Sequence, residues 1–409
     1  MKKLIALILM SSCAINISAQ RNLTVTVSNP TSAMRADAPV VVDLKEAGTT
    51  VKSALVKLNG VEIPCQLDDL DGDNVNDELC FLANVKGHEK QTFTISLSQQ
   101  GKPREYPART FAELMLRNPK VTIKNKHDIF LHELTVERGV NPYSIVHHHG
   151  VAFESELIAM RIYFDHRQTV DLYGKKHKAL EIKDTQFYPD EQQLKQGYGD
   201  DVLWCGTSFG LGALRGWNGQ DQTMLEDVEY RTQRVISKGP VRTIVELVDD
   251  QWIPKEGMAP VDMQTRYTVY GGHRDCSVDI AFDRPVPEYL FATGLVNVEG
   301  SSEFTDKKGL RGCWGSAYAV SGKDTLTHPK ETVGLGIRIP RRHIVSEEKA
   351  NPVNYGYVVN TKTDKIHYDI VYCSDKEDFG FHSANDWYAY LKKWKKELEE
   401  PIVVQIAWQ

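Results

Sequence analysis

The sequence lacks several features that would place it in a familiar class of protein. Basic residues do not dominate: 49 lysines and arginines face 55 acidic residues, a formal net charge of -6 over 409 residues. Nucleic-acid-binding proteins neutralise phosphates with clustered basic side chains, so this balance argues against nucleic acid as a partner. No apolar run is long enough to span a bilayer, and we expect no transmembrane segment.

Common metal and phosphate motifs are also missing. The chain contains no HExxH zinc motif and no GxxxxGK[ST] phosphate loop. Its cysteines never show CxxC spacing, so a zinc ribbon or a redox motif is not supported. In an oxidising compartment Cys65 and Cys80 could pair across a hairpin, or thiols in apolar strands could pack as small hydrophobic groups. The cysteines after the N-terminal segment are Cys65, Cys80, Cys205, Cys276, Cys313 and Cys373.

The N-terminus has the three-part pattern of a secretory signal peptide. Two lysines follow Met1, an apolar run extends from Leu4 to Met10, and small residues end the segment at Ala19. We therefore exclude residues 1–19 from the fold and expect a periplasmic or secreted protein. Cys13 lies in a weak lipoprotein-like sequence, but Met10 stands where leucine is preferred, and we expect acylation of Cys13 less than cleavage after Ala19.

The remaining chain predicts an all-β protein. Residues 20–103 alternate apolar and polar side chains in short runs between Asn, Pro, Gly and Asp turns, which is typical of a small β-sandwich. Residues 104–409 add further strand patterns without regularly alternating long helices, so we expect a large β-sandwich and no doubly wound α/β sheet. The one helix predicted spans 383–400, with Ser383 as N-cap and an apolar stripe containing Trp387.

An acidic loop in the small domain is the most specific local motif. Its sequence, DLDGDNVNDE, places carboxylates at positions 1, 3, 5 and 9, a spacing that can wrap oxygens around Ca²⁺. The loop lacks the glycine and the final glutamate of an EF-hand, and its neighbours read as strands. We expect a structural calcium site; the alternative is a metal-free hairpin capped by its own side chains. The predicted ligands are Asp69, Asp71, Asp73 and Asp77.

The segment from His147 to Asp165 points most strongly to chemistry. If residues 154–165 form one strand, Arg161, Tyr163 and Asp165 lie on one face and Glu154, Glu156, Met160 and Phe164 on the other. Charge on both faces suggests that at least one lines a cleft. An edge strand protected from aggregation would give the same pattern. The catalytic candidates are His147, His149, Glu154, Arg161, Tyr163 and Asp165.

A glycine-rich segment at 203–219 is a candidate for binding a ligand. Glycines allow close approach of the backbone, and tryptophan rings stack on the apolar faces of sugars. An ordinary wide turn with buried tryptophans is an equal alternative. The candidates for contacting substrate are Tyr173, Tyr188, Trp204, Arg215, Trp217 and His273. A metal held by His147 and His149 with Glu154 or Glu156 is a further, weaker alternative.

The order of these motifs resembles a known family. The acidic loop is followed by HGVAFESE (149–156), RIYFD (161–165) and DLYGK (171–175), an order similar to a secreted domain-of-unknown-function family of bacterial polysaccharide-utilisation loci. The resemblance covers most of the mature chain and implies a galactose-mutarotase-like or polysaccharide-lyase-like β-sandwich acting in glycan metabolism. It implies no catalytic residues.

These observations together predict a periplasmic enzyme for acidic oligosaccharides, most simply a lyase that performs β-elimination on a uronic acid. Arg161 or Arg215 would neutralise the carboxylate, His147 or His149 would remove the proton, and Tyr163 or Tyr188 would protonate the leaving oxygen. A glycoside hydrolase using two of Glu154, Glu156 and Asp165 is the first alternative. A non-catalytic mutarotase-like sugar-binding protein and a calcium-stabilised structural protein are the others.

Overall fold

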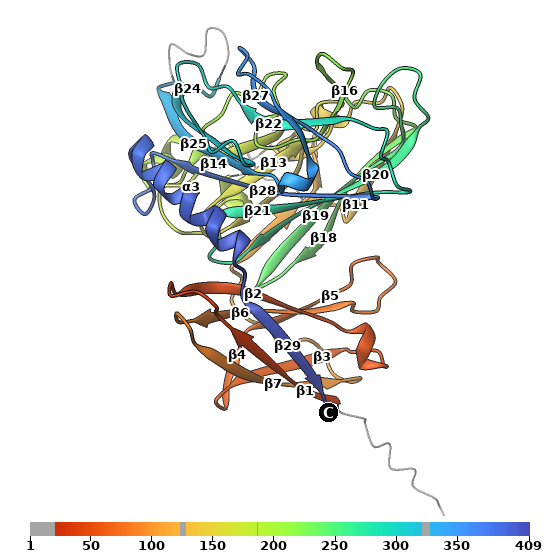
Figure 1. Cartoon of the computed structure of the whole chain (residues 1–409), viewed down its shortest axis with the longest axis vertical. Helices are drawn as coiled ribbons and strands as arrows, with labels where there is room; N and C mark the ends of the chain where they lie inside the picture. The colour runs from red at the N-terminus through yellow and green to blue at the C-terminus, as the bar shows by residue number, and fades with distance from the viewer. Residues whose placement is uncertain (1–20, 123–127, 186, 321–327) are drawn as a thin grey trace, which may run out of the picture.

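A computed structural model of the chain describes residues 21–122, 128–185, 187–320 and 328–409. The predicted signal peptide and Cys13 lie outside these residues. Figure 1 shows two β-rich bodies, one above the other, with a single long helix beside the larger one. The prediction of a mainly all-β chain is confirmed.

The smaller body is a sandwich of two antiparallel sheets. Its five-stranded sheet has the order β29 (Val403–Trp408), β1 (Arg21–Ser28), β7 (Lys90–Ser98), β3 (Ser53–Leu58), β4 (Val61–Ile63). Its three-stranded sheet has the order β2 (Arg35–Asp43), β6 (Glu78–Val85), β5 (Cys65–Asp68). Strand β29 comes from the far end of the chain and pairs along β1, as Figure 1 shows. The first and the last of the described strands therefore both belong to this sandwich.

Strict alternation of side chains places the core of the small sandwich. On β1, Leu23, Val25 and Val27 are at most 1% exposed, whereas the intervening threonines point outward. Antiparallel pairing sets Val25 opposite Phe93 of β7, so the apolar faces of neighbouring strands coincide. Burying this face against the second sheet is what holds the two sheets together.

The larger body also has two layers. One layer is a nine-stranded antiparallel sheet with the order β11 (Glu133–Glu137), β18 (Tyr230–Lys238), β19 (Arg242–Trp252), β20 (Val261–Tyr270), β21 (Asp275–Phe282), β28 (Lys365–Ser374), β25 (Lys330–Arg338), β24 (Leu310–Tyr318), β23 (Ser302–Thr305).

The other layer consists of two five-stranded sheets. The first, which carries the candidate site, has the order β15 (Asp200–Asp201), β14 (Val170–Gly174), β13 (Ala159–Tyr163), β12 (Gly150–Ser155), β8 (Thr110–Glu113). The second has the order β17 (Gln222–Thr223), β16 (Arg215–Trp217), β22 (Phe291–Val296), β27 (Asn354–Val359), β26 (Ile344–Glu347). The short strands β9 (Met115–Leu116) and β10 (Ile129–Phe130) pair separately.

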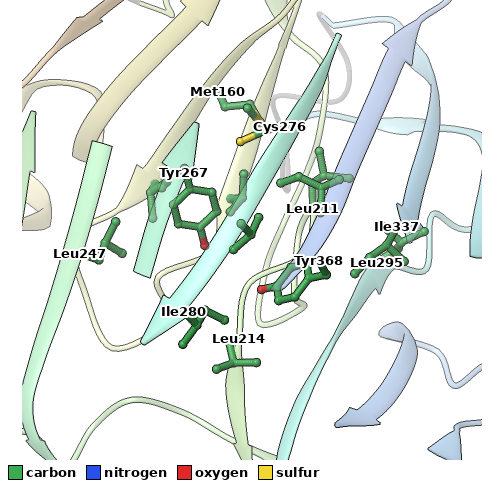
Figure 2. Packing of buried hydrophobic residues seen from close by; sticks show 14 of the residues in the cluster. Met160, Leu211, Leu214, Leu247, Tyr267, Cys276, Ile280, Leu295, Ile337 and Tyr368 are labelled. Carbon is green, nitrogen blue, oxygen red and sulfur yellow. The ribbon is translucent and has the colours of Figure 1, made fainter. Parts of the chain in front are cut away.

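One apolar cluster fills the space between these layers. Figure 2 shows side chains from the nine-stranded sheet, such as Tyr267 and Ile280, near Met160, Leu211 and Leu295 from the opposite layer. Tyr267 and Tyr368 are at most 2% exposed. The hydroxyl of Tyr368 donates to the carbonyl oxygen of Gly212 at 2.6 Å, which satisfies a polar group that would otherwise be costly to bury.

The helix α3 (Ala384–Glu399) packs on the outer face of the nine-stranded sheet. Ser383 caps it, because its hydroxyl accepts a hydrogen bond from the amide of Asp386 at 3.2 Å. Leu391 lies over the paired glycines Gly312 and Gly336, where a β-carbon would approach it to 2.3 and 2.5 Å. Glycine at both positions therefore lets the helix lie close to the sheet.

Further short elements connect these sheets. They are the 3-10 helices η1 (Lys45–Ala47), η2 (Pro142–Ser144), η3 (His147–His149) and η5 (Arg341–His343), and the helices α1 (Ile182–Thr185) and α2 (Glu191–Lys195).

All six cysteines in the described part of the chain are buried free thiols. The considered Cys65–Cys80 disulfide is therefore absent: the register pairs Cys65 with Phe81 and Gln66 with Cys80, so the two thiols are not cross-strand partners. The thiols pack as small apolar groups instead. Within the described residues, no helix is long and apolar enough to cross a membrane.

Candidate functional site

The sheet β15-β14-β13-β12-β8 has two faces of opposite chemistry. Its inner face is apolar and joins the main core through Phe153, Met160 and Leu172. Its outer face carries charged and aromatic side chains, and it is buried as well, since Phe187 and Ile182 cover Ala152, Ala159 and Tyr173. A polar layer has thus been enclosed between the sheet and the segment after β14.

The predicted distribution of charge over both faces is wrong. Residues 154–165 do not form one strand, because the chain turns between Ser155 and Ala159, where the amide of Ser155 bonds to the carbonyl of Ile158 at 3.0 Å. The turn resets the alternation and pairs Glu154 with Ala159 and Ala152 with Arg161. Glu154 and Arg161 consequently share the outer face, whereas Met160, which was predicted to lie on the face of Glu154, faces the core.

Arg161 is the centre of the polar layer. Although it is only 3% exposed, its Nε donates to Oδ2 of Asp171 at 2.8 Å and its Nη2 to Oδ2 of Asp201 at 2.9 Å. The guanidinium also lies 4.6 Å from the ring centroid of Phe187. Burial together with the neighbouring Asp171 raises the pKa of Asp201 well above its usual range. Because Asp171 and Asp201 share one cation, ionising both carboxylates costs more free energy than ionising only one.

A line of hydrogen bonds leads from Arg161 to less buried groups. Nη1 of Arg161 donates to the Tyr188 hydroxyl at 2.6 Å, and that oxygen lies 2.9 Å from Nε2 of His149. The other ring nitrogen of His149 lies 2.9 Å from the carbonyl oxygen of Tyr143, which can only accept. Nδ1 therefore carries a proton, and the neutral ring presents the lone pair of Nε2 to the Tyr188 hydroxyl.

The surroundings keep His149 neutral. Burial lowers the pKa of its imidazole to about 4 despite the hydrogen bond to Tyr143, and the positive charges of Arg161 and Arg117 act in the same direction. The ring stacks on Tyr143 at a centroid distance of 3.9 Å. Burial also raises the pKa of Tyr188, against the opposing effect of Arg161. At neutral pH this is an imidazole base beside a protonated phenol.

Tyr163 is more buried than Tyr188. It is 7% exposed, and its hydroxyl donates to Oδ2 of Asp171 at 2.7 Å. Burial and the charge of Asp171 raise its pKa far above the ordinary value. Of the two tyrosines predicted as proton donors, Tyr188 is therefore the one whose hydroxyl faces His149, and Tyr163 supports the carboxylate that holds Arg161.

A second cation borders the aromatic rings. The guanidinium of Arg167 lies 5.1 Å from the ring centroid of Tyr143 and 4.8 Å from that of Tyr163. Its side chain is 23% exposed and forms an ion pair with Asp165 at 2.5 Å. Arg167 was not among the predicted residues, although its place just after the RIYFD strand could have indicated it.

The three carboxylates predicted for a hydrolase are each held in an ion pair. Glu154 is fully buried beside Nζ of Lys175 at 2.6 Å and also accepts from the amide of Ile182 at 3.0 Å. Glu156 pairs with Arg109 at 2.5 Å, and Asp165 with Arg167. Burial raises the pKa of Glu154, whereas Lys175 opposes that shift. These groups contribute to structure as they stand.

The other two histidines of η3, His147 and His148, are buried. His147 and His148 are 4% and 0% exposed, and their rings meet edge to face at 4.2 Å. Nε2 of His148 lies 2.6 Å from Oε1 of Glu113 on β8. Neither His148 nor Glu113 was predicted from the sequence, because their proximity depends on the pairing of β8 with β12.

Trp204 lines a hollow of about 380 Å³ next to this sheet. It is 53% exposed, and Tyr318 and Glu331 also line this hollow. Arg215, predicted as its neighbour in binding, is instead fully buried and donates from Nη2 to the carbonyl oxygen of Ser208 at 3.0 Å. Burial lowers the pKa of Arg215 to about 10.

Other predicted contacts have structural partners. Tyr173 is fully buried and donates to Oε2 of Glu181 at 3.0 Å. Nε2 of His273 lies 2.8 Å from the carbonyl oxygen of Asp37, so His273 bridges the two bodies. Trp217 is half-buried on β16.

The loop 206–210 matches the GxSxG pattern of a nucleophile elbow, which the prediction from sequence had missed. Ser208 is 1% exposed, and its hydroxyl donates to the carbonyl oxygen of Cys205 at 2.6 Å. A buried hydroxyl bound to a carbonyl is a turn-forming group, and we assign it no chemistry.

The acidic loop brings three of its four predicted ligands together. Carboxylate oxygens of Asp69, Asp71 and Asp77 lie within 4.8 Å of one another. Several carboxylates also accept backbone amides, for example Asp69 from Asn74 at 2.7 Å and Asp73 from Val75 at 2.7 Å. This geometry suits both alternatives, and calcium binding remains a prediction.

Comparison with known proteins gives a family and a distant likeness. A family model described as a domain of unknown function (DUF4861) matches residues 27–404. An α-mannosidase from Enterococcus faecalis V583 has 8% identity and a TM-score of 0.48, and a glycosyl hydrolase family 38 protein from Enterococcus faecalis has 7% and 0.49. Each alignment covers 94% of this chain, which spans 46% and 47% of those proteins, about half of their length. No curated protein matches the sequence.

Proposed function

The chain belongs to the family described as a domain of unknown function (DUF4861), and we propose that it is a periplasmic enzyme that cleaves acidic oligosaccharides by β-elimination. The hydrogen-bonded line from Arg161 through Tyr188 to His149 carries this proposal. Tyr188 and His149 supply the proton donor and the base that elimination needs, and the buried Arg161 holds the Tyr188 hydroxyl in place.

The reaction can be assigned to these atoms. Nε2 of His149 accepts the proton at C5 of the uronic acid, the electrons form the C4–C5 double bond, and the bond from C4 to its oxygen breaks. Tyr188 gives its proton to the departing oxygen, and the proton on His149 returns to Tyr188 along their 2.9 Å hydrogen bond. The cycle leaves both side chains as they began.

A cation would hold the sugar carboxylate. The exposed Arg117, whose charge acts on His149, is the candidate for this role. Neutralising that carboxylate makes the C5 proton more acidic, because the negative charge that develops on the carboxylate in the transition state is stabilised. Trp204, on its adjoining hollow, would offer a stacking surface to a further sugar unit.

The state of the carboxylates supports elimination over hydrolysis. A glycosidase needs one carboxylic acid and one available carboxylate. Glu154, Glu156 and Asp165 each already neutralise a basic side chain. Using one of them would leave a buried or half-buried cation without its partner, which is costly.

The test is direct. Purified protein without residues 1–19 is incubated with a panel of uronic-acid-containing oligosaccharides, and products are followed by ultraviolet absorbance of the unsaturated sugar and by mass spectrometry. We expect absorbance to rise with cleavage for wild type and for the control His177→Ala, whose exposed ring pairs with Asp378. His149→Ala should lose the activity.

Other outcomes would change the assignment. Cleavage with addition of water and no absorbance would replace elimination by hydrolysis. Binding without any cleavage would indicate a sugar-binding protein. Undiminished elimination by His149→Ala would remove His149 from the mechanism.

A further inference from the structure

We propose that Glu113, His147 and His148 form a binding site for one zinc-class divalent metal ion, separate from the Arg161 line. Their ligand atoms all lie within 4.8 Å of one another, and Nε2 of His148 is 2.6 Å from Oε1 of Glu113. All three side chains are at most 4% exposed. The donors therefore converge in a place from which most water is excluded.

The donor set matches this class of metal. Two imidazoles and one carboxylate form a ligand set that zinc takes with a fourth position left for water or substrate. Hard ions such as Ca²⁺ and Mg²⁺ prefer oxygen donors, so the histidines select against them. The acidic loop, by contrast, offers only carboxylate oxygens, the donors that hard ions such as Ca²⁺ prefer.

The backbone is held in a strained form at this point. His148 has φ 58° and His149 has φ 61°, both in the left-handed region that non-glycine residues rarely adopt. Such residues persist only where the surrounding structure holds them in this conformation. The turn directs His148 toward Glu113 while the next residue, His149, reaches Tyr188. One strained turn thus serves two neighbouring polar sites.

The register places the two sites side by side. Glu113, Ala152, Arg161 and Asp171 are consecutive cross-strand partners on the outer face. Two strand spacings separate Glu113 from Arg161, roughly 10 Å. The ring of Phe187 lies between them, packed on Arg161 at 4.6 Å and near the His148 ring at 5.7 Å. A small alanine and a phenylalanine therefore keep the sites apart.

The test measures metal binding and does not require a substrate. Protein is stripped of metal, incubated with Zn²⁺ in excess Ca²⁺ so that surface carboxylates are occupied, passed through a desalting column and analysed for zinc. Wild type and His177→Ala should retain about one zinc per chain, whereas Glu113→Gln and His147→Gln should bind at least about tenfold more weakly. Circular dichroism checks that the variants are folded.

A second readout distinguishes loss of metal binding from loss of folding in the variants. Co²⁺ added to wild type should give the visible absorption of an ion with imidazole ligands, and Zn²⁺ should abolish it. Zinc should also raise the unfolding temperature of wild type and leave that of Glu113→Gln unchanged. Wild-type protein that retains no zinc and gives no cobalt spectrum would overturn the site, and so would variants that bind as tightly as wild type. Neither result bears on whether His149 and Tyr188 cleave sugar.

Discussion

Two buried arginines, Arg161 and Arg242, are each 3% exposed and each bind two carboxylates, yet their networks end differently. Arg242 joins the bodies: it bonds Asp68 and Glu78 of the small sandwich, and Gln66 beside it accepts the amides of Val241 and Arg242 at 3.0 and 3.1 Å. This network also reaches the Ser237 hydroxyl and Tyr270, whose pKa is raised by burial, and none of these partners is an imidazole base.

The network of Arg161 ends on groups that can exchange protons. Its third partner, Tyr188, is half-buried and contacts the neutral ring of His149. The difference teaches that burial and pairing of charge do not by themselves mark an active site. What distinguishes the candidate site is a continuous hydrogen-bonded path from a fixed cation to a titratable pair near the surface.

The largest expected effect concerns the interface. Arg242→Ala should lower the free energy of unfolding by about 3–5 kcal/mol, because it leaves Asp68 buried without its cation. Chemical denaturation of wild type and variant measures it. Lys195→Ala, at an exposed helical pair with Glu191, is the matched control and should change stability by less than about 0.5 kcal/mol. Equal effects of the two variants would contradict the assignment of Arg242 as a clamp.

The acidic loop offers the next test, because Asp68 and Glu78, the partners of Arg242, flank it. If the loop binds calcium, Ca²⁺ at a hundred times its dissociation constant should stabilise the protein by about 2.7 kcal/mol. Unfolding temperatures are compared in Ca²⁺ and in chelator. In Asp71→Asn the two unfolding temperatures should be equal, whereas the exposed Asp378→Asn should keep the wild-type difference. If Ca²⁺ does not change the unfolding temperature of wild type, the loop is a metal-free turn capped by its own hydrogen bonds.

Tyr163→Phe sharpens the comparison within the Arg161 network. Asp171 would lose a donor at 2.7 Å in a buried place, and we expect a loss of about 1–3 kcal/mol in unfolding free energy. Tyr188→Phe, at a less buried hydroxyl, should lose less than about 1 kcal/mol. The same denaturation experiment measures both, and the reverse order would show that Tyr188 is the structural residue.

The smallest effect is one of pH. Burial lowers the pKa of His273, but its hydrogen bond with Asp275, the charge of Asp275 and the Asp37 carbonyl outweigh burial and raise it to about 9. A raised pKa means that its stabilisation is complete below about pH 6.5 and is lost as pH rises through 9. For this partly exposed pair we expect on the order of 1 kcal/mol. Unfolding temperatures from pH 6 to 10 should fall more for wild type than for His273→Gln; parallel curves would contradict this.

Much of the fold could be predicted because it is local. Alternation along β1 and capping of α3 by Ser383 need only neighbouring residues. The pairing of β29 with β1 could not, since their contact joins residues nearly four hundred positions apart. The alternation of apolar residues along a strand does not indicate which other strand it pairs with.

The site was predicted in part for the same reason. His149, Arg161 and Tyr188 stood out as ionisable residues in a strand-rich segment, and the structure brings them into hydrogen-bonded contact. Asp171 and Glu113 could not be recognised from the sequence, because their roles depend on the register of four neighbouring strands. The turn after Ser155 also moved Glu154 to the face of Arg161, which alternation alone predicted incorrectly.

The most direct test of the account is the turnover of Tyr188→Phe on the first acidic oligosaccharide that wild type cleaves. Loss of a general acid should lower kcat by about 10²- to 10⁴-fold. Arg242→Lys, which keeps the cation at the interface, should stay near the wild-type kcat. A Tyr188→Phe enzyme that turns over as fast as wild type would contradict the claim that the Arg161 line performs the chemistry.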